Sequence, residues 1–237
     1  MEKYKPLQYK AYEYLKEKIL NGSFEYGKFY SESGVAAETG FSRTPIKDAL
    51  TRLCHDKYID IIPSKGFCLH IISAEDIRNS YQLRTAIEGF CASALAEKMG
   101  SKKAEKTLMK MRKNLEDMYV AIQENVSLTE FVSIDMQFHG IMVDFAENTE
   151  FNDLAESYNH RQYEYALKTF EEDGRIQSAY EEHKVIYEKI AKGKFTEAYE
   201  ALKNHMDKTC DISLKLMAMD DDEKNVYWFL GYIIHDI

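Results

Sequence analysis

The spacing of apolar residues in the first third of the chain predicts three helices. Apolar positions recur there every three or four residues, the interval that places them on one face of a helix. Asn21-Gly22 and Gly40 provide helix stop signals, and Ser31 and Ser42 are candidate N-caps. The predicted helices cover residues 7–20, 31–39 and 42–55.

The pattern then changes from a helical period to short β-rich runs. Residues 58–62 and 67–71 are rich in Ile, Phe and other strand formers, and the sequence Pro63-Ser64-Lys65-Gly66 between them is typical of a tight turn. Three helices followed by a two-stranded hairpin are the elements of a winged helix-turn-helix. We therefore expect a winged helix-turn-helix domain over residues 1–72.

After Ser73 the whole pattern is helical, and Ser73 with Asp76 has the spacing of a capping box. Consecutive helices with short connections pack as an antiparallel bundle. We therefore expect a mainly α fold, with an all-α bundle of six to seven helices over residues 75–218 and a helical extension over residues 219–237. The predicted helices lie near residues 74–98, 101–125, 128–147, 149–171, 174–192, 195–218 and 222–235.

Charge is divided unevenly between these regions. The chain has a formal net charge of −9, but residues 1–72 carry +2 and the remainder −11. A protein with one part facing nucleic acid has such a distribution. The sequence lacks an apolar run of the ~18–20 residues that span a bilayer, its start lacks the apolar stretch of a signal peptide, and its four cysteines are widely spaced, as is typical of reduced thiols. We expect a cytoplasmic protein with no membrane partner.

Polar and basic residues gather at the start of the third predicted helix. A recognition helix places its N-terminal turn in the major groove, where arginine binds guanine or phosphate and hydroxyl groups bind phosphate or bases. Taken singly, each residue is better explained as a solvated group on an exposed helix, and it is the order of elements together with the motif that favours DNA binding. The candidate DNA-binding residues are Ser42, Arg43, Thr44 and Lys47 in the helix, and Lys65 and Gly66 at the tip of the predicted wing.

Polar residues also stand on the predicted core faces of the bundle. Asp135 and His139 are four residues apart on an apolar helix face, and His183 and His205 each lie on an apolar stripe of another helix. A lone inward histidine is usually a hydrogen-bonded core residue, but each of these groups would need its own partner. Together they can bind one divalent ion, Zn²⁺ or Ni²⁺ first, with Mn²⁺ and Fe²⁺ as alternatives.

Arg84 falls on the apolar stripe of the first bundle helix, and a buried guanidinium needs an anion. Glu88, one turn along, is the simplest partner. The alternative is the carboxylate of a bound ligand, held bidentately while the metal binds its other oxygens. Both interpretations stay open on the sequence alone.

The segment Gly40–Leu53 (GFSRTPIKDALTRL), together with Pro63–Phe67 and Ile19–Gly27, resembles the GntR family of bacterial regulators. Two positions differ from the usual family pattern: Lys47 stands where arginine is common, which weakens bidentate guanine contact, and Ser33 replaces a frequent arginine. The resemblance implies that four of the candidate residues contact operator DNA: Arg43, Thr44, Lys47 and Gly66.

The bundle resembles the FCD-type sensor domain of the FadR-like branch of that family, over about residues 75–215. In metal-binding members the matching aspartate and three histidines ligate the ion, and the residue matching Arg84 faces a small carboxylate effector. All four ligand positions are filled here, which argues against the acyl-CoA-binding type. The resemblance is carried by Leu83–Glu88, Asp135–His139, Asn148, Glu182-His183 and His205.

These features predict a ligand-responsive DNA-binding transcription regulator, with repression as the working hypothesis. We expect a homodimer on a short palindromic operator, with a divalent metal ion and a small carboxylate effector bound in the bundle. One alternative is a regulator whose metal is purely structural. Another is a metal-dependent hydrolase, but Glu182 is expected to point away from the core and the sequence offers no nucleophile motif, so we do not expect an enzyme.

Overall fold

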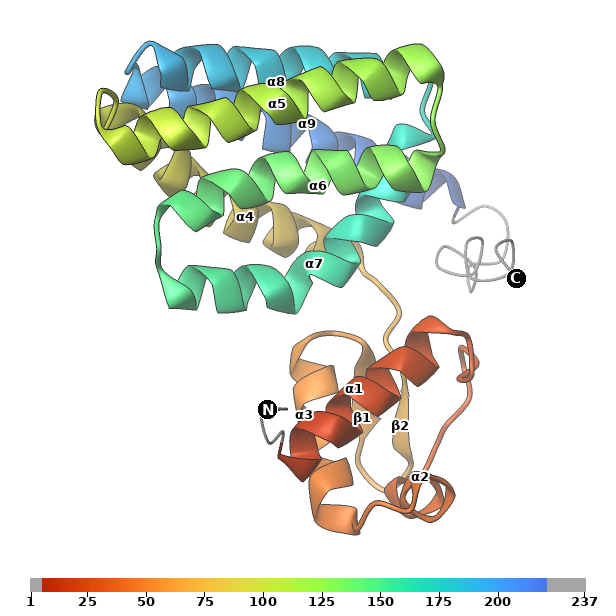
Figure 1. Cartoon of the computed structure of the whole chain (residues 1–237). Coiled ribbons are helices and arrows are strands. Elements are labelled where there is room, and N and C mark those ends of the chain that lie inside the picture. Colours follow the sequence, from red (N-terminus) through yellow and green to blue (C-terminus); the bar gives the residue numbers. More distant parts are fainter. Residues whose placement is uncertain (1–5, 221–237) are drawn as a thin grey trace. The chain divides into compact units, whose positions relative to one another are not determined.

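The computed structural model describes residues 6–220, which fall into two compact units, residues 6–72 and 73–219. Most residues are helical, and one small antiparallel sheet lies in the first unit (Figure 1). The predicted mainly α fold is therefore confirmed.

The first unit contains three helices followed by a hairpin, as the sequence predicts. Ser31 caps the second helix, because its hydroxyl accepts a hydrogen bond from the Gly34 N–H at 3.0 Å. Ser42 stands at the N-cap of the third helix, but its side chain makes no capping bond with any described residue, so that part of the prediction is wrong. The elements are α1 (Leu7–Leu20), α2 (Glu32–Thr39), α3 (Arg43–His55), β1 (Ile59–Ile62) and β2 (Gly66–Leu69).

One apolar core joins all of these elements. Leu15 of α1, Ile46 and Leu53 of α3, and Ile59 and Phe67 of the hairpin are almost fully buried in it. The strands pair antiparallel with Ile59 opposite Leu69. The hairpin therefore packs on the same apolar core as α3.

Gly66 is at a close backbone approach. Tyr30 and Phe67 exchange two backbone hydrogen bonds, of 2.8 and 2.9 Å, which add a bridge beside the hairpin. Gly66 has φ +102°, and a Cβ atom there would lie 2.1 Å from the Tyr30 carbonyl oxygen. Because only glycine fits this conformation and this space, the turn depends on Gly66 for structural reasons.

The second unit is a helical bundle (Figure 1). Its first helix begins with the predicted capping box, in which the Asp76 N–H donates to Ser73 Oγ and the Ser73 N–H donates to Asp76 Oδ2. Six of the predicted bundle helices lie in the described residues, and the seventh, over residues 222–235, lies outside them, with most of the 219–237 extension. The helices are α4 (Ala74–Glu97), α5 (Lys102–Glu124), α6 (Leu128–Phe145), α7 (Thr149–Phe170), α8 (Arg175–Ala191) and α9 (Phe195–Asp220).

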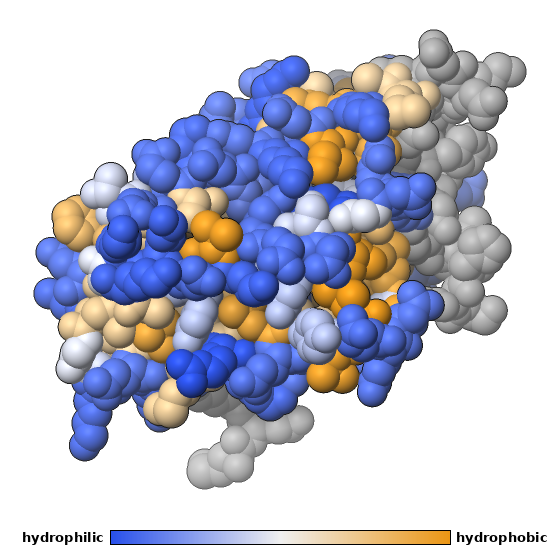
Figure 2. Space-filling model, turned by 90° about the horizontal axis from the view of Figure 1, so that it is seen from above, coloured by the Kyte–Doolittle hydropathy of each residue, from blue (hydrophilic) through white to orange (hydrophobic). Residues whose placement is uncertain are grey.

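The apolar faces of these helices form the core of the second unit. Phe131, Phe138 and Met142 of α6 are buried there, as are Ile186 of α8 and Leu202 of α9. Figure 2 shows a face of this unit on which hydrophilic residues dominate and hydrophobic ones lie in separate patches. Among the helices of residues 6–220, none combines the length and the hydropathy of a membrane-spanning segment.

Candidate functional site

The start of α3 presents four polar side chains to solvent. Ser42, Arg43, Thr44 and Lys47 are all exposed, whereas Ile46 between them is buried in the domain core. The first turn of α3 contains no acidic residue. The helix dipole and the free N–H groups at such a terminus favour a phosphate or another anion. The structure thus places these four predicted residues on one exposed surface, and their contact with DNA stays a prediction.

The predicted wing residues have different environments. Lys65 is exposed, and its Nζ lies 5.3 Å from the centre of the Phe29 ring. Gly66 is half-buried beside the backbone of Tyr30, as described above. The close backbone approach explains why glycine is needed at position 66 without any DNA contact, so a role of Gly66 in DNA binding also stays a prediction.

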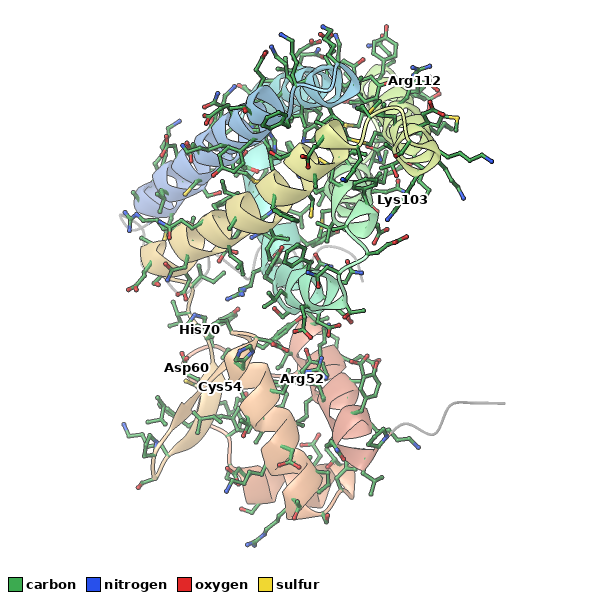
Figure 3. The ribbon with its side chains drawn as sticks, turned by 90° about the vertical axis from the view of Figure 1, so that its left-hand side faces the viewer. Arg52, Cys54, Asp60, His70, Lys103 and Arg112 are labelled. Atoms are coloured by element: carbon green, nitrogen blue, oxygen red, sulfur yellow. The ribbon has the colours of Figure 1, made fainter. Side chains whose placement is uncertain are left out.

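Side chains near the C-terminal end of α3 join this helix to α1. The buried Asp56 accepts a hydrogen bond from the Tyr12 hydroxyl at 2.7 Å, and the Arg52 guanidinium lies 4.2 Å from the centre of the Tyr12 ring. Figure 3 shows Arg52 on α3, with Asp60 and His70 adjacent on the hairpin, where His70 Nδ1 and Asp60 Oδ1 are hydrogen-bonded at 2.9 Å. The contacts of Tyr12 with Asp56 and Arg52 join α1 to the end of α3, and none of these contacts was predicted from the sequence.

Three histidines from three helices meet inside the bundle. His139 of α6, His183 of α8 and His205 of α9 are all buried. One ring nitrogen of each lies within 4.8 Å of the others, and the ring centres are 4.7 to 5.3 Å apart. The structure therefore brings together the three imidazoles that the sequence pattern aimed at the core, in a group of the kind that holds a metal ion.

Asp135 lies at the edge of this group, one helical turn before His139. Its Oδ1 atom is 3.6 Å from His183 Nε2, which is too long for a hydrogen bond. Two ligand atoms of one tetrahedral ion, each about 2.0–2.2 Å from it, lie roughly 3.3–3.6 Å apart. Asp135 Oδ1, His139 Nε2 and His183 Nε2 are buried and have no hydrogen-bond partner among the described residues. Because buried polar atoms are normally paired, these unpartnered atoms fit the ligand set of a metal ion.

Carboxylates hold the other ring nitrogens of two histidines. His139 Nδ1 donates to Glu88 Oε2 at 2.6 Å, and His205 Nδ1 donates to Glu182 Oε2 at 2.7 Å. The expectation that Glu182 points away from the core is wrong, because its long side chain turns back from α8 to reach His205 on α9. Carboxylates in these places orient imidazoles for a metal and make them better ligands.

The charge states of these groups suit the same role. Burial opposes ionisation of Glu88, but Arg84 and His139 outweigh it and lower its pKa to about 2. The pKa of Glu182 is likewise about 2, since His205 and Arg175 overcome the effect of burial. Burial is the first cause of a lowered pKa in both His183 and His205. Glu88 and Glu182 are therefore ionised, and burial favours the neutral form of His183 and His205, which is the form that binds metals.

Arg84 is buried on α4 and is bonded on both sides. Its Nε donates to Glu88 Oε1 at 2.7 Å, and its Nη1 donates to Gln162 Oε1 at 2.9 Å. The simpler of the two sequence interpretations, an Arg84–Glu88 pair, is therefore present. Since Glu88 also holds His139, the structure links Arg84 to the histidine group through one shared carboxylate.

A cavity of about 740 Å³ opens beside this link, between α4, α6 and α7. Arg84, Glu88 and His139 line it, so the cavity reaches both the guanidinium and the edge of the histidine group. Tyr158 also lines it, and its buried hydroxyl has no partner among the described residues. The remaining lining mixes polar and apolar residues: Ser133, Ile134, Met136, Gln137, Gly140, Val143, Asp144, Asn152, Ala155, Glu156, Asn159 and Gln162.

Comparison with known proteins places both units in established families. Residues 7–69 match the model of the bacterial regulatory proteins of the gntR family, and residues 79–208 match the FCD domain. The regulator YdhC of Bacillus subtilis is 26% identical over 211 residues, which are 89% of this chain and 92% of YdhC. The transcriptional repressor RspR of Escherichia coli is 28% identical over 142 residues, 60% of each chain.

A solved structure has the same fold along most of the chain. McbR/YncC of E. coli superposes with a TM-score of 0.62 at 16% identity, covering 90% of this chain and all of that one. These matches agree with the winged helix-turn-helix unit and the helical bundle described above. The chain therefore belongs to the GntR family of DNA-binding transcription regulators, which are not enzymes, and its second unit is an FCD sensor domain.

Proposed function

We propose that this protein is a cytoplasmic, homodimeric repressor that binds a short palindromic operator and responds to a small carboxylate effector through a metal ion in its FCD domain. One observation carries the proposal: carboxylates hold Nδ1 of His139 and of His205. In the same cluster the buried atoms Asp135 Oδ1, His139 Nε2 and His183 Nε2 have no hydrogen-bond partner among the described residues. Repression follows the activity printed for the relative RspR, and four free cysteines suit a reducing compartment.

Operator binding would use the exposed start of α3. Arg43 would bind guanine or phosphate, Ser42 and Thr44 would bond phosphate or base, and Lys47 would add a cation one turn along. Lys65 and Gly66 would place the wing against the adjacent groove or backbone. Two copies in a dimer would place two recognition helices on two half-sites, which is why the operator is expected to be palindromic.

The metal ligands would be Asp135, His139, His183 and His205. Three nitrogens and one oxygen without thiolate suit Zn²⁺ or Ni²⁺, with Mn²⁺ and Fe²⁺ as alternatives. The bound ion would supply positive charge and open coordination positions for an anionic ligand. The carboxylates on His139 and His205 support this assignment, because metal-ligating histidines commonly donate their other ring N–H to a carboxylate.

The effector would occupy the cavity that Arg84 and His139 line. Its volume of about 740 Å³ is in the range of small-molecule sites, which combine a concave shape with a few polar anchors. A carboxylate that reaches Arg84 would have to share it with Glu88, which holds His139. Effector and metal would therefore act on the same connected group, and different affinities in two conformations would shift operator binding.

The metal assignment is tested on the purified full chain after chelator stripping. Zn²⁺ affinity is measured by competition with a chromophoric chelator for the unmodified protein, for His139→Ala and for a control, His55→Ala, whose side chain is 79% exposed in the other domain. We expect one high-affinity Zn²⁺ that His139→Ala loses and His55→Ala keeps. Full Zn²⁺ content in His139→Ala would show that the site is wrong.

The effector assignment is tested with operator DNA selected from a random library. Zn²⁺-loaded protein on this DNA is titrated with a panel of mono-, di- and tricarboxylates, and release is followed by fluorescence anisotropy. Gly140→Leu provides the matched variant, because Gly140 lines the cavity with open space around its Cβ position. We expect the response to vanish in Gly140→Leu. Unchanged DNA affinity across the panel would instead favour a purely structural metal.

A further inference from the structure

Two histidines of the cluster are each backed by an arginine–glutamate pair. His139 donates to Glu88, which also accepts from Arg84. On the other side of the cluster, His205 donates to Glu182, which also accepts from Arg175 at 3.0 Å. The two sets come from different helices, so the repeated arrangement is a property of the site and not of one local sequence motif.

The set behind His205 is unusually complete. Arg175 is buried, and besides Glu182 it donates to Ser178 Oγ at 2.9 Å and to Thr209 Oγ1 at 2.8 Å. Lys208 donates to the second oxygen of Glu182 at 2.6 Å. Thr209 in turn donates to the backbone carbonyl of His205 at 2.7 Å. Both the side chain and the backbone of His205 are therefore tied to Arg175.

The two sets differ in their relation to the cavity. Arg84 and Glu88 line it, whereas Arg175 and Glu182 do not. The third histidine has neither kind of support: His183 Nδ1 lies 3.4 Å from the Met118 sulfur, and its ring stacks on Phe138 at 4.3 Å. Within the described residues, the Glu182 set is thus the only carboxylate support of the cluster that stands apart from the proposed effector cavity.

We propose that Glu182 and Arg175 are positioning residues that hold His205 in the tautomer and orientation a metal requires, and so set metal affinity independently of the effector. An Nδ1–H bound to Glu182 leaves the lone pair on His205 Nε2 for the ion. Arg175 fixes the carboxylate through a guanidinium fork that is itself held by Ser178 and Thr209. This inference rests on the proposed metal site.

The test measures Zn²⁺ affinity of the metal-stripped full chain by chelator competition. Glu182→Gln keeps the shape of the side chain but removes its charge. We expect a loss of roughly 10- to 100-fold, the usual effect of removing such a partner. The control is Glu181→Gln, one residue earlier, where the carboxylate bonds only surface groups in the described structure, Gln177 and Lys184. It should keep the original affinity.

A double-mutant cycle separates positioning from a general effect on folding. In a His205→Ala background, the histidine through which Glu182 acts is gone, so Glu182→Gln should cost little further Zn²⁺ affinity. The Co²⁺-loaded protein gives a second readout, because the visible absorption of Co²⁺ should change in Glu182→Gln and not in Glu181→Gln. Arg175→Gln should follow Glu182→Gln in both readouts if it folds, and Glu182→Gln decides the matter if it does not.

The outcomes distinguish this inference from the proposed function. If the unmodified protein binds no Zn²⁺, the metal site itself is wrong. If His205→Ala weakens binding but Glu182→Gln does not, or if the Glu182→Gln loss persists undiminished in the His205→Ala background, the metal site stands and the positioning role is overturned.

Discussion

The two domains use polar side chains in opposite ways. At the start of α3, the candidate DNA-binding residues are exposed, and Arg43 and Lys47 lie where solvent or a partner can reach them. In the FCD domain, Arg84, Glu88 and His139 are buried and bonded to one another. A surface side chain can be removed with little effect on folding, whereas removal of one member of a buried ion pair leaves the other charge buried without a partner. Substitution of the same residue type, such as arginine, should therefore affect stability differently in the two domains.

The largest expected difference is between two arginines. Arg84→Ala should lower the free energy of unfolding of the FCD domain by about 3–5 kcal/mol, because it leaves the Glu88 carboxylate buried without its cation. Arg43→Ala should change the stability of its own domain by less than about 0.5 kcal/mol. Hydrogen–deuterium exchange across a urea series measures the two domains separately. Equal losses of stability in the two variants would contradict the contrast between the buried Arg84 and the exposed Arg43.

The next effect concerns the wing. Gly66→Ala should destabilise the first domain by about 1–3 kcal/mol through backbone strain, with a further cost from the clash at the Tyr30 carbonyl. Gly27→Ala is the matched control, since Gly27 also has a positive φ but open space around it. Thermal unfolding of the two variants separates strain from clash. A stable Gly66→Ala protein would contradict the close approach at this turn.

A substitution at the exposed start of α3 should change DNA binding although it leaves stability nearly unchanged. Arg43→Ala should weaken binding to selected operator DNA by about 1–3 kcal/mol, or roughly 5- to 150-fold, through the loss of a guanine or phosphate contact. Zn²⁺ affinity should stay the same, because Arg43 belongs to the other domain. Anisotropy titrations measure the affinities for operator DNA and for random DNA, and chelator competition measures the Zn²⁺ affinity. An equal loss on the two DNAs would limit Arg43 to phosphate binding.

A smaller effect is expected for Lys47, which carries a point charge. Lys47→Ala should reduce the slope of log affinity against log salt concentration by about one, as expected for one lost phosphate contact. Lys103→Ala is the control, because Lys103 is exposed on the FCD domain, where it pairs with Glu147. Operator titrations at four salt concentrations give the slopes. An unchanged slope for Lys47→Ala would remove it from the interface.

The smallest expected effect is a gain in the stability of the FCD domain. Gly140 lies inside α6 with open space around its Cβ position, so packing does not require glycine there. Gly140→Ala should stabilise the FCD domain by about 0.5–1 kcal/mol, since alanine is the better helix former. Thermal unfolding measures the shift. A loss of stability would mean that the wall of the cavity beside Gly140 is tighter than its geometry indicates.

Local features of the chain were predictable because they depend on near neighbours in the sequence. The helix spacing, the capping box of Ser73 and Asp76, and the turn before Gly66 each involve residues a few positions apart. The prediction that Ser42 caps α3 with its side chain failed, because the same residue type also serves at a helix start without a capping bond. Local signals indicate where a helix begins more reliably than they indicate which side-chain atoms bond its first backbone N–H groups.

The partners of the buried groups were harder to predict. Helix periodicity placed Glu182 beside His183 but off the core face, yet its side chain reaches His205. Arg175 was not singled out at all, since an arginine at the start of a helix resembles many surface residues. Its position next to the inward-facing His183 could have drawn attention to Glu182. However, periodicity gives only the side of the helix on which a residue lies, and not its distance to residues of a neighbouring helix.

By itself the sequence determined the order of helices and strands, the two-part organisation and the inward faces that carry Asp135, His139, His183 and His205, because periodicity and capping act over a few residues. Only the tertiary structure decided that the three imidazoles meet, that Glu88 and Glu182 hold two of them, and that Arg84 shares Glu88 with His139. These contacts join helices that are far apart in the chain. Their distances depend on how the helices pack, which no short stretch of sequence encodes.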